Sequence, residues 1–363
     1  MTAAWVVSLI LLFSACAEHS PVVYAGEAAS EGPMMITPIK AGTKYENWLP
    51  TPMMLAGRSM WSVGWQWIKG GERDKPEVEI PVVSLNQKSF SEAPAEGLTV
   101  RWLGHSAALI EMSGQRVLID PVLNKYASPV PGFAGRFSSS PIRLEDLPRI
   151  DTVVISHDHY DHLEKDTIVF LSQRGALFFV PTGVGQHLRA WGILPGQIRE
   201  LSWWEESPFG RLTFICVPAR HFSGRGLFDR DETLWAGWIV RSESKSLYYS
   251  GDTGYANHFS AIGERYGPFD LTMIKIGAYN DAWPYIHVKP EEAVKAQVEL
   301  KGKLFLPVHW GTFTLALHPW DEPIMRAVKA AKENGIRIAT PLIGELVDID
   351  KPVSTRTWWE EVK

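Results

Sequence analysis

Residues 151–162 read DTVVISHDHYDH, and this stretch decides how the chain is interpreted. Its first half is an apolar run typical of a buried strand, and the run leads directly into a polar loop, where ligand sets are usually found. The loop contributes four candidate metal ligands, which are His157, His159, Asp161 and His162. Zinc accepts imidazole nitrogens and carboxylate oxygens. Together with Asp158, the six positions contain three histidines and two aspartates, more than one tetrahedral ion needs from one loop. The sequence therefore predicts a pair of metal ions.

Three further candidate ligands follow strand-like runs elsewhere in the chain. His221 follows LTFICVPAR, Asp252 follows SLYYSG, and His309 follows KLFLPV. Taken singly, His221 is compatible with a surface residue and Asp252 with the start of a turn. Taken together with the loop, the three residues complete a ligand set for two metal ions.

From residue 98 onward, short strand patterns alternate with helical ones, an order that fits two sheets with helices outside. The expected strands are 98–105, 107–112, 117–120, 152–156, 177–180, 212–217, 235–240, 247–250, 271–276 and 304–307. One expected helix begins at about residue 163, and a second ends at residue 191. Three more are expected over 256–266, 291–300 and 322–334.

The first 16 residues are expected to be a signal peptide rather than part of the fold. Residues 3–15 form an almost unbroken apolar run that is short for a membrane span, and small residues precede Cys16. This arrangement resembles the lipobox of bacterial lipoproteins, in which the cysteine is lipidated, although residue 13 is Phe and residues 1–5 contain no Lys or Arg. We expect a lipid-anchored protein of the bacterial cell envelope facing the periplasm; the alternatives are a cleaved periplasmic protein and an uncleaved anchor.

Residues 17–97 are rich in Pro, Gly and charged residues and are expected to form an extension laid over the main domain. Within it, apolar residues recur at roughly helical intervals between 53 and 68, including Trp61 and Trp65, which predicts an amphipathic aromatic segment. Two interpretations stay open: a helix packed on the core, or a surface that meets lipid or an acyl chain.

Composition narrows the class of partner. The net charge of −5 supplies no basic excess for phosphate contacts, which argues against nucleic acid as a partner. Besides Cys16 the only cysteine is Cys216, within an apolar run, so it is expected to be a buried strand thiol. Any zinc must then be held by histidines and carboxylates.

The motifs around these residues resemble those of the metallo-β-lactamase superfamily, and within it those of N-acylphosphatidylethanolamine-hydrolysing phospholipases D and their bacterial relatives. The matching stretches are RWLGHSA at 101–107, ISHDHYDHL at 155–163, SWWEE at 202–206, GDTGY at 251–255, GPFDLTMIKIGAY at 267–279, HVKPEEAV at 287–294 and HWGTF at 309–313. The resemblance implies an α/β fold of the αββα type, with two central mixed sheets flanked by helices. The hydrolase domain is expected over 98–350, followed by a C-terminal tail over 351–363.

The resemblance also implies a ligand set for two zinc ions. One ion takes His157, His159 and His221, the other takes Asp161, His162 and His309, and Asp252 bridges the two. A bridging hydroxide would then be the nucleophile at neutral pH. The implied reaction cleaves a phosphodiester in an N-acyl phosphatidylethanolamine, releasing an N-acyl ethanolamine and phosphatidic acid, and a lactonase or another phosphodiesterase is the alternative.

Several residues carry further expectations. The ligand Asp161 is also a candidate for moving a proton during the reaction. Tyr160, through its phenol, and His287, by the resemblance, are candidates for binding the substrate's phosphate. His105 is expected to hydrogen-bond a ligand rather than bind metal. Lys275 stands where the relatives tend to have Pro; a solvated charge at a strand end and a determinant of headgroup preference both stay open. The resemblance makes a phospholipid and a membrane surface the expected partners and allows a homodimer.

Overall fold

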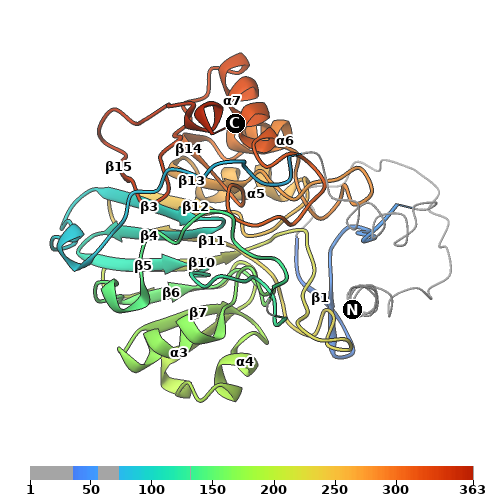
Figure 1. Cartoon of the computed structure of the whole chain (residues 1–363). Helices are drawn as coiled ribbons and strands as arrows, with labels where there is room; N and C mark the ends of the chain where they lie inside the picture. Colours follow the sequence, from blue (N-terminus) through green and yellow to red (C-terminus); the bar gives the residue numbers. More distant parts are fainter. Residues whose placement is uncertain (1–35, 56–72, 131, 363) are drawn as a thin grey trace.

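The computed structural model describes residues 36–55, 73–130 and 132–362. The predicted signal peptide with Cys16 lies outside these residues, as does the aromatic segment from residue 56 onward. Two β-sheets pack face to face, and helices cover the outer side of each sheet (Figure 1). This arrangement confirms the predicted αββα architecture.

The first sheet has seven strands in the order β15-β3-β4-β5-β6-β7-β8. Its strands are β3 (Leu98–Gly104), β4 (Ala107–Met112), β5 (Gln115–Ile119), β6 (Thr152–Val154), β7 (Leu177–Pro181), β8 (Ile198–Leu201) and β15 (Leu346–Asp348). Antiparallel pairs join β15 through β5, and parallel pairs join β5 through β8, so the sheet is mixed.

The second sheet has six strands in the order β14-β13-β12-β11-β10-β9. Its strands are β9 (Glu206–Phe209), β10 (Leu212–Val217), β11 (Gly237–Arg241), β12 (Ser246–Tyr249), β13 (Phe269–Lys275) and β14 (Gly302–Val308). The pairs from β9 to β12 are antiparallel, whereas β12, β13 and β14 are parallel neighbours. The carboxyl ends of these three strands therefore meet at one edge.

Two groups of helices enclose the sheets. The helices α3 (Lys165–Gln173) and α4 (Gly185–Ala190) lie on the seven-stranded sheet, and α5 (His258–Tyr266), α6 (Pro290–Glu299) and α7 (Glu322–Glu333) lie on the six-stranded sheet. Short 3-10 turns span Gln87–Ser89, Leu144–Asp146, Pro195–Gln197 and Trp358–Glu361.

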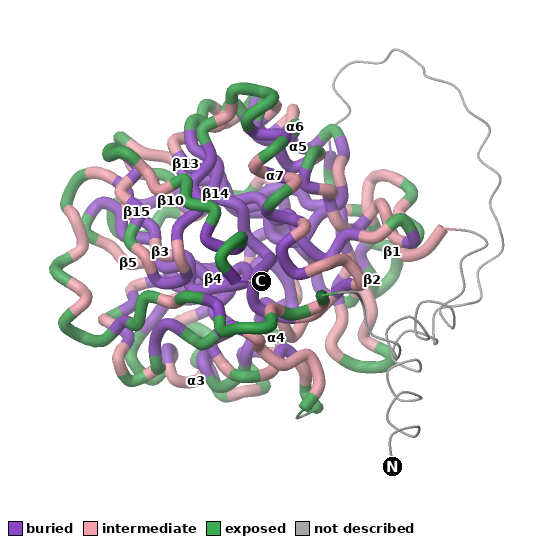
Figure 2. The backbone as a smooth tube through the Cα atoms, turned by 45° about the horizontal axis from the view of Figure 1, so that its top comes forward, coloured by how far each residue is buried: buried purple, intermediate pink, exposed green. Residues whose placement is uncertain are grey.

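The two-sided burial of the sheets follows from strand geometry. Along β4, Ala108 and Ile110 join the core between the sheets, whereas Ala107 and Leu109 join the core under α3 and α4. This alternation is the period-2 pattern of a strand buried on both faces. The rings of Phe179 on β7 and Phe214 on β10 stack 4.0 Å apart between centroids and join the two sheets. Figure 2 shows the resulting buried interior inside an exposed rim of loops.

The strands that the sequence did not reveal lie at edges. The strands β8 and β15 close the two ends of the seven-stranded sheet, and β9 closes one end of the six-stranded sheet. A short edge strand contacts the core on little of its surface, so it shows no run of alternating apolar residues. The same reason applies to the exposed hairpin of β1 (Ile39–Ala41) and β2 (Lys44–Glu46) within the extension.

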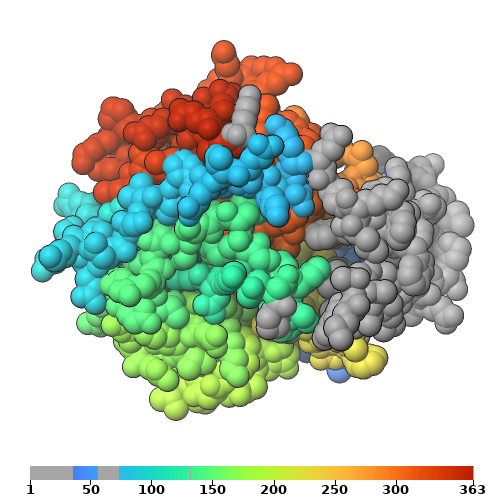
Figure 3. Space-filling view, viewed as in Figure 1, coloured from blue at the N-terminus to red at the C-terminus, as the bar shows by residue number. Residues whose placement is uncertain are grey.

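The extension and the C-terminal tail both pack on the main domain. Residues 73–97 run across the surface between the C-terminal part of the chain and residues 98–180 (Figure 3). Backbone hydrogen bonds from Val83 to Ile343 and from Leu85 to Pro141 fix this course. In the tail, Trp358 and Trp359 are buried in the same core as both sheets. Within the described ranges, no helix has both the length and the apolar character that a membrane span requires.

Candidate metal centre

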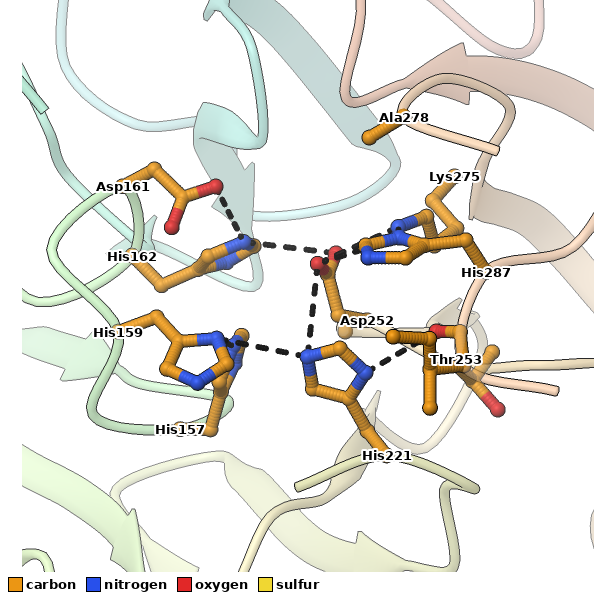
Figure 4. A network of polar contacts seen from close by, with 12 residues as sticks. His157, His159, Asp161, His162, His221, Asp252, Thr253, Lys275, Ala278 and His287 are labelled. Carbon is orange, nitrogen blue, oxygen red and sulfur yellow. Dashed lines mark hydrogen bonds and ion pairs between the residues drawn. The ribbon is translucent and has the colours of Figure 1, made fainter. Parts of the chain in front are cut away.

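All seven predicted ligands meet at one end of the two facing sheets. The HDHYDH loop follows β6 of the seven-stranded sheet, and it supplies His157, His159, Asp161 and His162. The six-stranded sheet supplies the others, because His221 follows β10, Asp252 follows β12 and His309 follows β14. Figure 4 shows the loop residues facing Asp252 and His221 across the site. Each ligand thus stands just beyond the carboxyl end of a strand.

The first group of ligands consists of three histidines. His157 Nε2 lies 2.8 Å from His159 Nδ1, and His221 Nε2 lies 3.4 Å from the same nitrogen. All three nitrogens fall within 4.8 Å of one another. The group therefore offers three imidazole nitrogens to a single ion, as a zinc site requires.

The second group contains Asp161, His162 and His309. Asp161 Oδ2 lies 3.4 Å from Nε2 of each of the two histidines. Asp252 stands between the groups: its Oδ1 is 3.4 Å from His162 Nε2 and 3.1 Å from His309 Nε2, whereas its Oδ2 is 3.8 Å from His221 Nε2. Since each carboxylate oxygen faces a different group, Asp252 has the geometry of a shared ligand.

Unpaired polar atoms test whether these residues fit metal ions. Among the described residues, Nε2 of His162, Nε2 of His309 and Oδ1 of Asp252 are buried without a hydrogen-bond partner. Buried polar atoms without partners are rare and costly in folded proteins. These three converge on one point, and a cation there would satisfy all of them, so the residues fit a metal ion.

Burial and local charge set the protonation of the site. Burial lowers the pKa of His157 and of His221 well below the usual range, which keeps both imidazoles neutral and able to bind metal. Burial alone would raise the pKa of Asp252, but His309, Lys275 and His162 hold it well below its usual range. Burial opposes the proton on His162, yet Asp161 and Asp252 raise its pKa well above the usual value. Metal binding must therefore displace a proton from His162.

Asp120 orients His162 and was not singled out from the sequence. Its Oδ2 lies 2.7 Å from His162 Nδ1 and accepts the Tyr249 hydroxyl at 2.5 Å, and its Oδ1 accepts the Ser156 backbone N–H at 2.7 Å. A partner on Nδ1 leaves Nε2 directed at the metal site. Asp120 directly follows β5, so the strand-end position that revealed the ligands could have revealed it too.

We expect Asp120→Ala to weaken metal binding about 10–100-fold, the usual cost of losing a hydrogen-bond partner of a metal-binding histidine. The measurement is competition for zinc with a chelator of known affinity, using purified wild type and variant. Asp151→Ala is the matched control, because Asp151 accepts the Arg116 backbone N–H at the start of β6 and makes no contact with a ligand. Equal zinc affinity in the Asp120 variant and the wild type would contradict the assigned role.

His221 is fixed on two sides. Its Nδ1 lies 3.0 Å from the Ile286 carbonyl oxygen, so Nδ1 carries the proton and Nε2 is free to bind metal. Asn47 of the extension accepts the His221 backbone N–H at 3.2 Å and donates to its carbonyl oxygen at 2.7 Å. The extension therefore helps to hold one of the predicted ligands in place.

His105 contacts a ligand, as the sequence suggested. Its Nε2 lies 2.9 Å from Asp161 Oδ2, and its ring lies 4.0 Å from that of His309 between centroids. Burial lowers the pKa of His105 to about 3, so the ring is a neutral donor to the carboxylate. Its nitrogen also lies within the second ligand group, so His105 has the position of a further ligand as well as of a supporting residue.

Tyr160 is turned to a neighbouring loop rather than to the ligands. Its hydroxyl donates to the Arg225 carbonyl oxygen at 3.1 Å, and the Arg225 guanidinium stacks on its ring at 3.9 Å. Within the described part of the chain, the phenol makes no hydrogen bond to a predicted ligand. Asp158 of the same loop accepts the Gly224 backbone N–H at 2.8 Å and the Thr233 hydroxyl at 2.8 Å. These two residues fasten the ligand loop to residues 224–233.

His287 lies beside both ligand groups. Its ring centroid is 5.2 Å from that of His221 and 5.8 Å from that of His309, and its Nδ1 is 3.7 Å from Asp252 Oδ2. The side chain is 13% exposed, so a ligand can reach it. This position suits the predicted contact with a substrate phosphate.

The burial of Lys275 shows that one of the two interpretations made from the sequence, a solvated charge at a strand end, is wrong. Lys275 is fully buried at the end of β13, with Nζ 3.2 Å from Asp252 Oδ2, and is therefore not a solvated charge. Burial lowers its pKa to about 8, while Asp252 acts in the opposite direction. The residue belongs to the metal centre, and a sequence read without the fold cannot show that a strand-end lysine turns inward.

Fold and site together define a metal-dependent hydrolase, and comparison with known proteins identifies its family. A β-lactamase superfamily domain matches residues 115–310, which is more than half of the chain. The protein belongs to the β-lactamase superfamily.

Two relatives and one solved structure illustrate the range of similarity. An uncharacterized protein of Mycobacterium tuberculosis is 46% identical over 81% of this chain and 80% of its own length. The N-acyl-phosphatidylethanolamine-hydrolyzing phospholipase D 1 of Caenorhabditis elegans is 37% identical over 65% of this chain and 69% of its own length. A metallo hydrolase from the archaeon Ignicoccus hospitalis superimposes with a TM-score of 0.54 at 25% identity, covering 69% of this chain and 97% of that one.

Proposed function

We propose that the protein is a two-zinc phosphodiesterase that cleaves N-acyl phosphatidylethanolamine-type phospholipids to an N-acyl ethanolamine and phosphatidic acid. The observation that carries the proposal is the arrangement of Asp252: its two oxygens face two separate ligand groups, and His287 lies beside both. The similarity to the phospholipase D of Caenorhabditis elegans supports the choice of substrate class.

Zinc ions bound at such paired sites lower the pKa of water to roughly 7 and stabilise charge on phosphate oxygens. The protein's own side chains then divide the remaining tasks. His157, His159 and His221 would hold one ion, and His162 and His309 would hold the other with Asp161. His287 orients a phosphate oxygen. Asp161, 15% exposed, would use the oxygen not directed at His105 to take a proton from the attacking water and pass it to the leaving alkoxide. Tyr160 takes no part in this reaction, because its hydroxyl donates to the Arg225 carbonyl oxygen.

A substrate screen tests the proposal. N-acyl phosphatidylethanolamine, bis(p-nitrophenyl) phosphate and a lactone are each incubated with zinc-loaded wild type and with Asp252→Ala. We expect cleavage of both phosphodiesters by the wild type only, with phosphatidic acid as a lipid product. Cleavage of the lactone alone would replace the proposal with a lactonase, and cleavage of the simple diester alone would leave a phosphodiesterase of another substrate class.

Metal analysis tests the cofactor. Zinc-reconstituted protein is expected to hold two zinc ions per chain by elemental analysis, because the ligands form two groups joined by Asp252. A chelator should abolish activity, and zinc should restore it. One ion per chain at saturation would contradict the two-zinc proposal.

We further propose that the enzyme works at a membrane surface. The loop that follows His221 presents Leu227 and Phe228 to solvent, and Phe228 is 83% exposed. Asp158 and Tyr160 fasten this loop to the ligand loop, so an apolar tip that entered a bilayer would remain close to the metal centre. A lipid-anchored place in the cell envelope would agree with this.

Leu227→Ser together with Phe228→Ser is expected to weaken binding to phospholipid vesicles about 100-fold or more while hydrolysis of bis(p-nitrophenyl) phosphate stays unchanged. The reason is the loss of about 1.5–3 kcal/mol of burial for each large apolar side chain that enters lipid. Vesicle co-sedimentation is the measurement. Leu194→Ser, at an exposed apolar residue between α4 and β8, is the control. Unchanged sedimentation of the double variant would exclude this loop as the membrane contact.

A further inference from the structure

Lys275 belongs to the metal centre, but the proposed reaction gives it no task. A buried ammonium is costly unless acceptors surround it. Here Nζ donates to Oδ2 of Asp252 at 3.2 Å and to Nδ1 of His287. The Lys275 backbone N–H donates to the Ser250 hydroxyl at 3.1 Å, which fixes the end of β13 beside β12. The side chain therefore joins a predicted ligand to a predicted substrate contact (Figure 4).

The contact with His287 determines where the imidazole proton lies. A lysine ammonium has three N–H donors and no acceptor, so Nδ1 of His287 must accept. In a neutral imidazole with an accepting Nδ1, the proton is on Nε2. The ring therefore offers an N–H donor from its Nε2 edge, the edge that neither Lys275 nor Asp252 occupies.

Without Lys275, His287 would face a different partner. Asp252 Oδ2 lies 3.7 Å from His287 Nδ1, and a carboxylate attracts a proton to the nitrogen beside it. The proton of a neutral ring would then move to Nδ1, and Nε2 would present a lone pair. A lone pair repels an anionic oxygen, whereas an N–H attracts it.

We infer that Lys275 is a positioning residue, which fixes the Nε2–H form of His287 so that this histidine donates to an anionic oxygen of the substrate. The same ammonium holds Oδ2 of Asp252 on the side of His221 and leaves Oδ1 to the second ligand group. The identity of the oxygen, one of a phosphodiester, rests on the proposed function; the position of the proton does not.

Nitrogen-15 NMR of histidine side chains tests the inference in the metal-free protein, where no substrate is required. His287→Ala identifies the His287 signals by their loss. We expect the Nε2–H form in the wild type and in Lys275→Arg, which retains a cationic donor, and a shift toward the Nδ1–H form in Lys275→Met. Lys303→Met is the control, because Lys303 is exposed and pairs with Asp270 away from the site. A wild-type ring protonated on Nδ1, or a ring unaffected by Lys275→Met, would overturn the inference.

A double-mutant cycle on hydrolysis of bis(p-nitrophenyl) phosphate tests the consequence for turnover. Loss of one hydrogen bond to a developing oxyanion lowers kcat about 100–1000-fold, so we expect Lys275→Met and His287→Ala each to approach this loss. Combining them should add little, since Lys275 acts through His287. Lys275→Arg should recover most of the activity. Fully additive losses would show that Lys275 does not act through His287.

The two measurements separate the two proposals. If the wild type does not cleave the diester, the proposed function fails for that substrate class, and the NMR result alone decides the role of Lys275. Zinc content and thermal unfolding of each variant, compared with the wild type, show whether a loss of activity comes from the proton position or from a lost metal ion or fold.

Discussion

Asp252→Ala is expected to remove zinc and catalytic activity together. Loss of a mere supporting partner of a ligand costs about 10–100-fold in affinity or activity, and Asp252 faces both ligand groups directly, so we expect a loss greater than about 100-fold. Elemental analysis after gel filtration and hydrolysis of bis(p-nitrophenyl) phosphate measure the two effects. Retention of two zinc ions with full activity would contradict Asp252 as the shared ligand.

This variant needs a matched control because it also removes the partner of a buried cation. Breaking a buried ion pair by deleting one member costs about 3–5 kcal/mol of stability, and Asp252→Ala leaves Lys275 beside an apolar side chain. Asp252→Ala combined with Lys275→Met removes both charges. If the double variant recovers the thermal stability of the wild type and still lacks zinc, the loss of metal is due to the missing ligand rather than to unfolding.

Trp359→Ala is expected to lower the free energy of unfolding by about 3–5 kcal/mol, the usual cost of truncating a buried aromatic residue. Trp359 lies against Trp310 and Trp358 at 5.9 and 5.7 Å between ring centroids. Trp310 directly follows the ligand His309 and also stacks on Trp102 at 5.1 Å. Truncation of this tail residue should therefore disturb the neighbourhood of the second ligand group.

Urea denaturation followed by circular dichroism measures the change. Glu360→Ala is the control, because Glu360 is the exposed neighbour of Trp359 and an exposed substitution usually changes stability by less than about 0.5 kcal/mol. A change below about 1 kcal/mol in Trp359→Ala would show that the tail contributes little to the fold.

Residues at the ends of strands were the most predictable part of the site. The loop after β6 and the polar residues after β10, β12 and β14 are visible because an apolar run stops at a histidine or carboxylate, and the structure brings all seven together. The inner strands and longer helices were predictable for a related reason: burial on one or two faces produces a periodic pattern.

Other features depend on contacts that no local pattern records. Lys275 is buried because β13 lies between β12 and β14 with its end at Asp252, and a charged residue at a strand end looks the same in sequence whether it turns inward or outward. The hydroxyl of Tyr160 turns to Arg225, which is 65 residues away. The tail over 351–363 was expected to lie outside the hydrolase domain, although Trp358 and Trp359 both pack into the central core.

The origin of the ligands in two different sheets has a thermodynamic consequence. Four ligands belong to the loop after β6 of one sheet, and the other three follow strands of the opposite sheet. Ions held by both sets would link the two sheets. They would add RT ln(1 + [L]/Kd) to the free energy of unfolding, where [L] is the free zinc concentration, or about 4.1 kcal/mol at a thousandfold excess over Kd. Removing the ions should therefore lower the melting temperature as well as the activity, and at low zinc concentration the two sheets would separate more readily.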